Sequence, residues 1–140
     1  MGTKAIYNLF KFIEDKKPQY KPPFKVKLIH APETLTKEDL NVKGDLDLND
    51  TPIQSLPNGL EVEGDLWLIS SQIQSLPDNL RVGGYLYLSY TPIQSLPNGL
   101  KVGGDLLLIN TPLSKKYTTE EQLKAKYPNI KVKGDIYLKW

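Results

Sequence analysis

The stretch TPIQSLPNGL occupies residues 51–60 and recurs without change at residues 91–100. Halfway between the two copies, residues 71–80 read SQIQSLPDNL, so the period of the repeat is 20 residues. A glycine followed two positions later by a leucine keeps the same period, at residues 44–46, 64–66, 84–86 and 104–106. Similarity at a fixed period of this length predicts a solenoid, in which each repeat forms one coil of a stacked chain.

Each repeat carries six apolar side chains at fixed offsets. In the third repeat these are Leu86, Leu88, Ile93, Leu96, Leu100 and Val102. The spacings Leu-x-Leu and Leu-x-Val are typical of short strands with one buried face. A single coil cannot bury that face by itself, so we expect the coils to stack in register, with Leu66 between Leu46 and Leu86.

Turn residues mark two corners in every coil. Pro57, Asn58 and Gly59 precede one strand of the coil, and Gly64 lies between that strand and the next. Proline presets its φ angle, and glycine accepts backbone conformations that other residues resist. These properties predict a change of chain direction at both places.

Both ends of the chain depart from the repeat. The alternation of Phe24, Val26 and Leu28 predicts a degenerate first coil, so the solenoid is assigned to residues 24–140, in about five to six coils. An apolar stripe predicts an N-terminal capping helix followed by a linker within residues 1–23. Ten inserted residues with Thr118 and Glu121 in a capping-box pattern predict a short helix near residues 119–126. The predicted fold class is a mainly β repeat solenoid of short parallel strands with these two helices.

The repeat resembles a known family. Residues 66–73 follow the pattern L-x-L-x-x-S-x-I, which is similar to the leucine-rich repeat signature with serine or threonine in place of its asparagine. Leu76 and Pro77 resemble the leucine–proline element of the short, 20-residue type found in bacterial and bacteriophage proteins. The resemblance implies a leucine-rich-repeat-like solenoid that recognises another protein and is not an enzyme. Likeness to phage-encoded copies implies a viral protein that inhibits a host factor, such as a defence component.

The composition argues against a catalytic, metal-binding or cofactor-binding site. The chain has no cysteine and one histidine, His30, without a matching acidic cluster, and it has no glycine-rich phosphate loop. We therefore expect no catalytic residue, metal or cofactor. No apolar run is long enough for a membrane span and no signal peptide is apparent, so a cytoplasmic location is expected, in the host cytoplasm if the protein is phage-encoded.

One side chain between the two buried leucines of each coil is expected to point outward. This row reads Asp47, Trp67, Tyr87, Leu107 and Tyr137. Aromatic side chains dominate the energetics of protein interfaces, so the row predicts a protein-binding surface. Its candidate residues are Trp67, Ile69, Tyr85, Tyr87, Tyr90, Leu107, Ile109, Tyr137 and Trp140. In the alternative interpretation, these side chains pack across strands or are covered by the N-terminal helix.

Charge and strand edges leave other hypotheses open. Residues 1–30 hold seven lysines and two acids, residues 111–140 seven lysines and three acids, and residues 31–110 four bases and eleven acids. The lysine-rich ends suggest a weak nucleic-acid binder, although the scarcity of arginine disfavours it. The last strand, residues 136–140, is expected to leave an open sheet edge. Either lysines protect this edge and the protein is a monomer, or two copies pair there as a homodimer. Self-association at the edge would also suit a structural component of a virion. The recurrent Asp45, Asp65, Asp105 and Asp135 are interpreted as turn residues and not as a calcium site.

Overall fold

The computed structural model describes residues 23–140, so the predicted helix and most of the linker within residues 1–23 lie outside the described part. The chain forms two compact units, which divide between Leu40 and Asn41. The described part of the first unit contains helix α2 (Phe24–His30) and the 3₁₀ helix η1 (Pro32–Thr34). The second unit, Asn41–Trp140, contains the repeats.

The prediction of a degenerate first coil from residue 24 is wrong, because residues 24–30 form helix α2. Phe24, Leu28 and Ala31 are spaced by four and three residues, and Leu28 and Ala31 are buried. A spacing of four residues returns to the same face in a helix and in a strand alike, so the short alternation did not distinguish the two. Within this unit the buried Lys27 forms an ion pair with Asp39, with 3.0 Å between Nζ and Oδ2.

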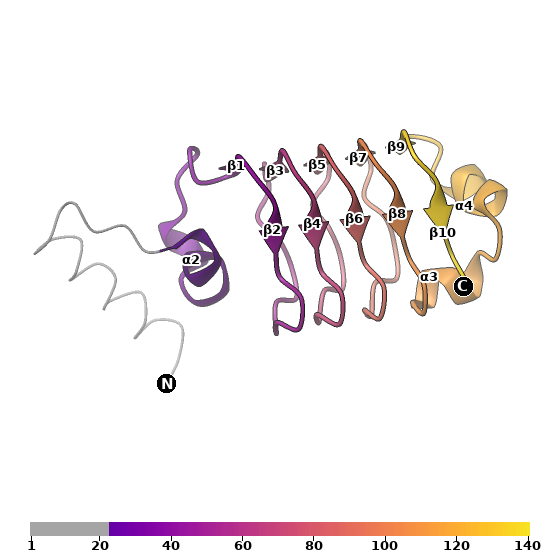
Figure 1. Cartoon of the computed structure of the whole chain (residues 1–140), viewed down its shortest axis with the longest axis horizontal. Coiled ribbons are helices and arrows are strands. Elements are labelled where there is room, and N and C mark those ends of the chain that lie inside the picture. The colour runs from indigo at the N-terminus through magenta and orange to yellow at the C-terminus, as the bar shows by residue number, and fades with distance from the viewer. Residues whose placement is uncertain (1–22) are drawn as a thin grey trace, which may run out of the picture. The chain divides into compact units, whose positions relative to one another are not determined.

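The repeats form a parallel β-solenoid, as predicted (Figure 1). Its two sheets have the strand orders β1-β3-β5-β7-β9 and β10-β8-β6-β4-β2. The strands of the first sheet, called sheet A here, are β1 (Asn41–Val42), β3 (Glu61–Val62), β5 (Arg81–Val82), β7 (Lys101–Val102) and β9 (Lys131–Val132). Those of the second, sheet B, are β2 (Leu46–Asp47), β4 (Leu66–Trp67), β6 (Leu86–Tyr87), β8 (Leu106–Leu107) and β10 (Ile136–Tyr137).

The stacking register follows the repeat period. Leu66 pairs with Leu46 on one side and with Leu86 on the other, and Leu86 pairs in turn with Leu106. Leu66, Leu86 and Leu106 are all fully buried, so equivalent leucines from successive coils form one continuous core.

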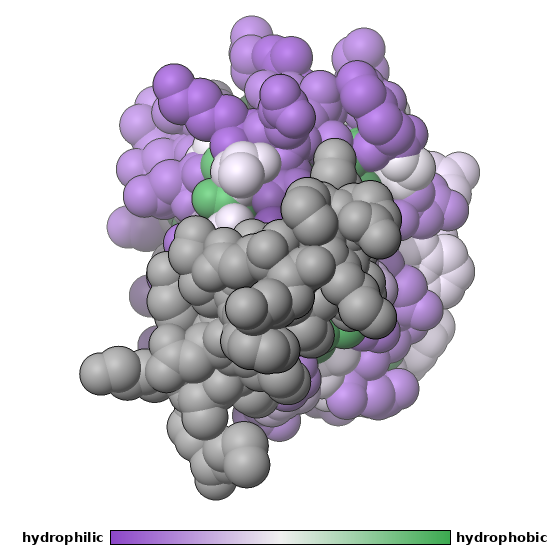
Figure 2. Space-filling view, turned by 90° about the vertical axis from the view of Figure 1, so that its left-hand side faces the viewer, coloured by the Kyte–Doolittle hydropathy of each residue, from purple (hydrophilic) through white to green (hydrophobic). Residues whose placement is uncertain are grey.

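The described surface in view in Figure 2 is mostly hydrophilic, with small apolar areas.

The number of coils is smaller than the five to six predicted. Residues 41–100 form three complete coils of 20 residues, the next coil contains two helices, and β9 and β10 form a final half coil. The helices are α3 (Pro112–Lys116) and α4 (Glu120–Lys126), and the latter confirms the helix predicted near residues 119–126. The count was too high mainly because residues 24–40 were included.

Hydroxyl side chains fix the starts of both inserted helices. Thr111 and Ser114 form a capping box, with 3.1 Å between the Ser114 nitrogen and Thr111 Oγ1 and between the Thr111 nitrogen and Ser114 Oγ. At α4 the N-cap is Thr119, whose Oγ1 accepts a hydrogen bond from the Gln122 N–H at 3.2 Å. The capping pair predicted at Thr118 is therefore displaced by one residue.

The two kinds of glycine corner have different physical origins. Gly59 adopts a φ of 84° and Gly99 one of 74°, in the left-handed region that glycine tolerates, as predicted for these turns. Gly64 has no positive φ. A Cβ atom at Gly64 would instead overlap the Asp45 carboxylate of the preceding coil. Close stacking of the coils, and not backbone conformation, therefore requires glycine at this second corner.

Candidate functional site

The outward side of sheet B carries a row of large side chains. Strand pairing places Trp67 beside Tyr87, Tyr87 beside Leu107, and Leu107 beside Tyr137. The ring centroids of Trp67 and Tyr87 are 4.7 Å apart, and Tyr85 meets Tyr87 edge-on with its centroid at 5.9 Å. These five residues are called the aromatic face below. Pairing between coils fixes their backbones, so the rings are held in place before any partner arrives.

The predicted binding residues differ in exposure. Trp67, Tyr87, Leu107 and Ile69 are half-buried, whereas Tyr85, Tyr90, Tyr137 and Trp140 are exposed. Ile109 is only 5% exposed, so its prediction as a surface contact is wrong. It lies in the same repeat position as Ser89, which is also buried, whereas Ile69 at this position one coil earlier is half-buried.

An aspartate row borders the aromatic face and links one coil to the next. Asp45 Oδ1 accepts a hydrogen bond from the Asp65 N–H at 2.7 Å, and Asp65 Oδ1 accepts one from the Tyr85 N–H at 2.8 Å. Asp105 repeats this contact with the Asp135 N–H at 2.8 Å. The aspartates thus have a structural role, as interpreted from the sequence. Across the described residues there is no group of three side chains suited to holding a metal ion.

The same aspartates make the aromatic face electronegative. Burial raises the pKa of Tyr87, and the nearby Asp65, Tyr85 and Asp105 raise it further. The Asp105 and Asp135 carboxylates raise the pKa of Tyr137. Both tyrosines therefore stay neutral at physiological pH, and their surroundings favour positive charge.

Tyr90 adopts a strained conformation beside this surface. Its φ of 61° lies in the left-handed region, as do those of Asp50, Ser70 and Asn110 at the same repeat position. A bulky side chain costs about 1–2 kcal/mol there, and asparagine costs less. Other coils carry aspartate, serine or asparagine at this corner, so the fold does not require tyrosine there, and the contact role of Tyr90 stays a prediction.

We expect Tyr90→Asn to raise the free energy of unfolding by about 1 kcal/mol, because the strain is relieved. Urea denaturation followed by circular dichroism measures the change. Tyr90→Phe keeps the bulk and should leave stability nearly unchanged. A loss of stability in Tyr90→Asn would show that packing of the tyrosine ring outweighs its backbone strain.

The open edge of the solenoid exposes backbone rather than core. Ile136 and Leu138 of the last half coil are each 8% exposed, so their side chains belong to the core. In sheet B, the N–H groups of Leu106 and Leu108 donate to carbonyls of the following strand, at Asp135 and Tyr137. A homodimer through this edge, which stays a prediction, would therefore use the corresponding N–H groups of Ile136 and Leu138.

Sequence reasoning missed a second surface, on the outward side of sheet A. Strand pairing aligns Arg81 with Lys101 and Lys101 with Lys131. With Lys133, these side chains line a hollow of about 340 Å³. The 20-residue period alone could have aligned the first two, but counting charge by chain segment placed Arg81 in an acidic region and concealed the row.

Comparisons with known proteins assign no family or function to these surfaces. No protein-family model matches the chain, and no curated protein or solved structure matches it at a significant level. Among the helices of residues 23–140, none combines the length and the apolar character needed to cross a membrane.

Proposed function

We propose that this protein is a non-enzymatic, leucine-rich-repeat-like binding module that docks a partner protein on its aromatic face. The observation that carries the proposal is the tilted contact between the Trp67 and Tyr87 rings, which continues into exposed rings at Tyr85 and Tyr137. Rigid aromatic side chains give large contact areas at little cost in conformational entropy. By its resemblance to phage-type repeats, the partner would be a host protein.

Cross-strand packing alone accounts for only part of this surface. Trp67 and Tyr87 bury part of their rings against each other, which also stabilises the sheet. Tyr85 and Tyr137, however, remain 43% and 41% exposed. Since polar residues would serve the fold equally well at such positions, the exposed rings favour a contact role.

The negative charge around the aromatic face indicates which side chains a partner would place there. The outward positions of sheet B carry the carboxylates of Asp45, Asp47, Asp65, Asp105 and Asp135 and one base, Lys139. A lysine or arginine side chain can lie over a Tyr or Trp ring while its charge faces these carboxylates. Each such contact contributes about 0.5–2 kcal/mol, according to how far it is desolvated. The proposed partner segment is therefore basic and interleaved with apolar residues.

Selection from a random displayed peptide library on the immobilised protein tests this function. We expect enrichment of peptides that combine lysine or arginine with apolar residues. The double variant Tyr85→Ser/Tyr137→Ser should weaken binding of these peptides by about tenfold or more, because it removes two exposed rings from the contact. Its circular dichroism should stay native, since both side chains are exposed.

The matched control alters sheet A. Asn41→Ser/Glu61→Ser changes two exposed side chains there and should leave peptide affinity unchanged. Peptides that bind the Tyr85/Tyr137 variant as tightly as the unaltered protein would contradict the proposal, as would enrichment of acidic peptides.

A further inference from the structure

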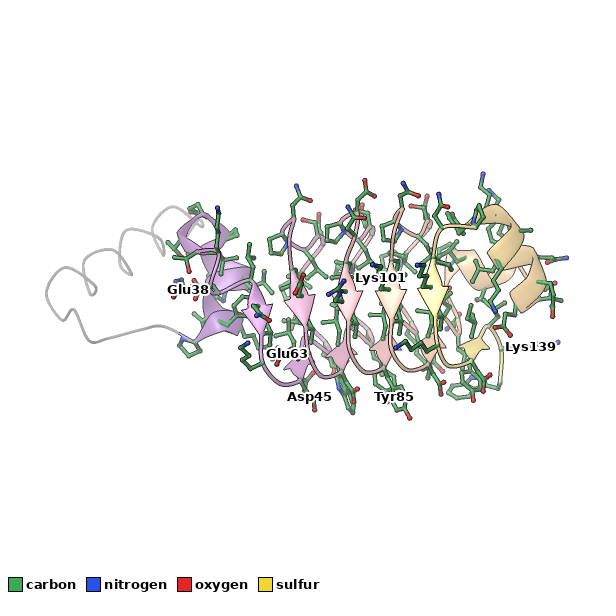
Figure 3. The ribbon with its side chains drawn as sticks, turned by 90° about the horizontal axis from the view of Figure 1, so that it is seen from above. Glu38, Asp45, Glu63, Tyr85, Lys101 and Lys139 are labelled. Atoms are coloured by element: carbon green, nitrogen blue, oxygen red, sulfur yellow. The ribbon has the colours of Figure 1, made fainter. Side chains whose placement is uncertain are left out.

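The outward side of sheet A changes from acidic to basic along the solenoid. Glu61 and Glu63 lie in its second coil, and Glu63 pairs with Lys43, with 3.3 Å between Oε1 and Nζ. The next strands present Arg81, Lys101 and Lys131 in register. In Figure 3, Lys101 lies over the strands of this sheet, whereas Asp45 and Tyr85 project at the lower edge of the view.

Stacking geometry creates a hollow between these cations. The repeat position occupied by Glu63 and Lys133 in other coils is glycine at residues 83 and 103. A Cβ at Gly83 would overlap the Glu63 carbonyl oxygen, and one at Gly103 would overlap the Gly83 carbonyl oxygen. Close contact of the coils thus enforces the missing side chains, and the hollow of about 340 Å³ is a fixed feature of the surface.

The hollow gathers four positive charges, and the one acidic side chain in register with them is Glu61, which lies beside Arg81 on the preceding strand. Arg81, Lys101, Lys131 and Lys133 line it, and within residues 23–140 none of the four forms an ion pair. Adjacent strands lie about 4.8 Å apart, and like charges directly opposite each other on a sheet are destabilising. An anion in the hollow would relieve this repulsion.

We propose that this hollow binds an anion with several linked phosphate groups. The three strands carrying the cations span about 10 Å. A phosphate chain places several charges within that span, whereas the carboxylates on one side of an extended acidic peptide lie about 6.6 Å apart. The Arg81 guanidinium can bind phosphate oxygens in pairs, and the three lysines supply point charges.

Two sources of linked phosphate fit this chemistry, a free polyphosphate and a nucleic-acid backbone. The residues that line the hollow include no aromatic side chain on which a base could stack. The lining therefore favours the free polyphosphate. The site lies on sheet A and the aromatic face on sheet B, so the site does not depend on the proposed docking function.

Titration with sodium tripolyphosphate, followed by calorimetry and by amide NMR shifts, tests the site. We expect saturable binding, with the largest shifts at Gly83 and Gly103. Lys101→Gln/Lys131→Gln/Lys133→Gln should weaken binding by about tenfold or more, because three charge-assisted contacts are lost. The control Lys115→Gln/Lys124→Gln/Lys126→Gln removes the same charge from α3 and α4 and should change binding less than about twofold.

Other results of this titration would overturn the site or change the ligand assigned to it. No binding of tripolyphosphate, or equal weakening in the two triple variants, would overturn the site. Tighter binding of an oligoglutamate peptide than of tripolyphosphate would replace the phosphate ligand by an acidic protein segment and so overturn the proposal. A single-stranded RNA of equal charge that binds more tightly than tripolyphosphate, and loses affinity in the same variant, would assign the phosphates to nucleic acid. Tyr85→Ser/Tyr137→Ser should bind tripolyphosphate normally, so failure of one proposal leaves the other intact.

Discussion

Replacement of Leu86 by alanine should lower the free energy of unfolding by about 2–5 kcal/mol. Leu86 is fully buried and lies in register between Leu66 and Leu106. Hydrogen bonds between stacked strands hold both neighbouring coils in place, so the surroundings cannot collapse into the space left by the side chain. Urea denaturation followed by circular dichroism would measure the loss as an earlier transition.

Leu107 provides the matched control because it is the same residue type on the adjacent strand. Its side chain points outward and is half-buried, so Leu107→Ala should cost clearly less, about 1 kcal/mol. Equal losses in the two variants would show that the row of buried leucines at Leu46, Leu66, Leu86 and Leu106 is not the main source of stability. That result would also remove the structural basis for the two surfaces described above.

The second large effect is expected at the glycine corner between the two sheets. Gly64→Ala should lower the free energy of unfolding by about 1–3 kcal/mol, because its Cβ would overlap the Asp45 carboxylate. The backbone nitrogen of Asp45 is also within 2.9 Å of that Cβ position, so moving the aspartate side chain alone does not relieve the contact. The substitution therefore forces two coils apart. Urea denaturation measures this loss in the same way.

Gly44 occupies the same repeat position one coil earlier. A Cβ at Gly44 has no neighbouring atom within 4 Å. Gly44→Ala should therefore change stability by no more than about 0.5 kcal/mol. If both substitutions were equally harmful, backbone freedom would explain the glycine row and the stacking account would be wrong.

The repeat period made most of the fold predictable. Once residues 51–60 and 91–100 are seen to be the same, equivalent leucines must be neighbours in space, and the register of both sheets follows. The row from Trp67 to Tyr137 follows for the same reason, since side chains alternate along a strand. The sequence therefore predicted the aromatic face before any contact was known.

Departures occurred where the period gave no information. Residues 24–30 lie outside the perfect repeats, and the short alternation of Phe24, Val26 and Leu28 did not distinguish a helix from a strand. Ile109 is buried although Ile69 at the same repeat position is half-buried, so the repeat offset alone does not specify exposure. The hollow at Arg81 was missed because its cations all lie on sheet A. The net charge of a chain segment adds the side chains of both sheets together, so the acidic residues of sheet B concealed these cations.

The threonines that stand in place of the asparagine of the leucine-rich repeat signature have a consequence for the length of the solenoid. Thr51, Thr91 and Thr111 each donate a hydroxyl hydrogen bond to a carbonyl three residues earlier, at 2.8, 2.7 and 2.7 Å. These bonds close within one coil, so they survive whichever coil comes next. Deletion or duplication of one 20-residue coil should therefore leave the remaining coils in shape. Such a change would lengthen or shorten both outward surfaces by one strand, and with it the number of residues that a partner can contact.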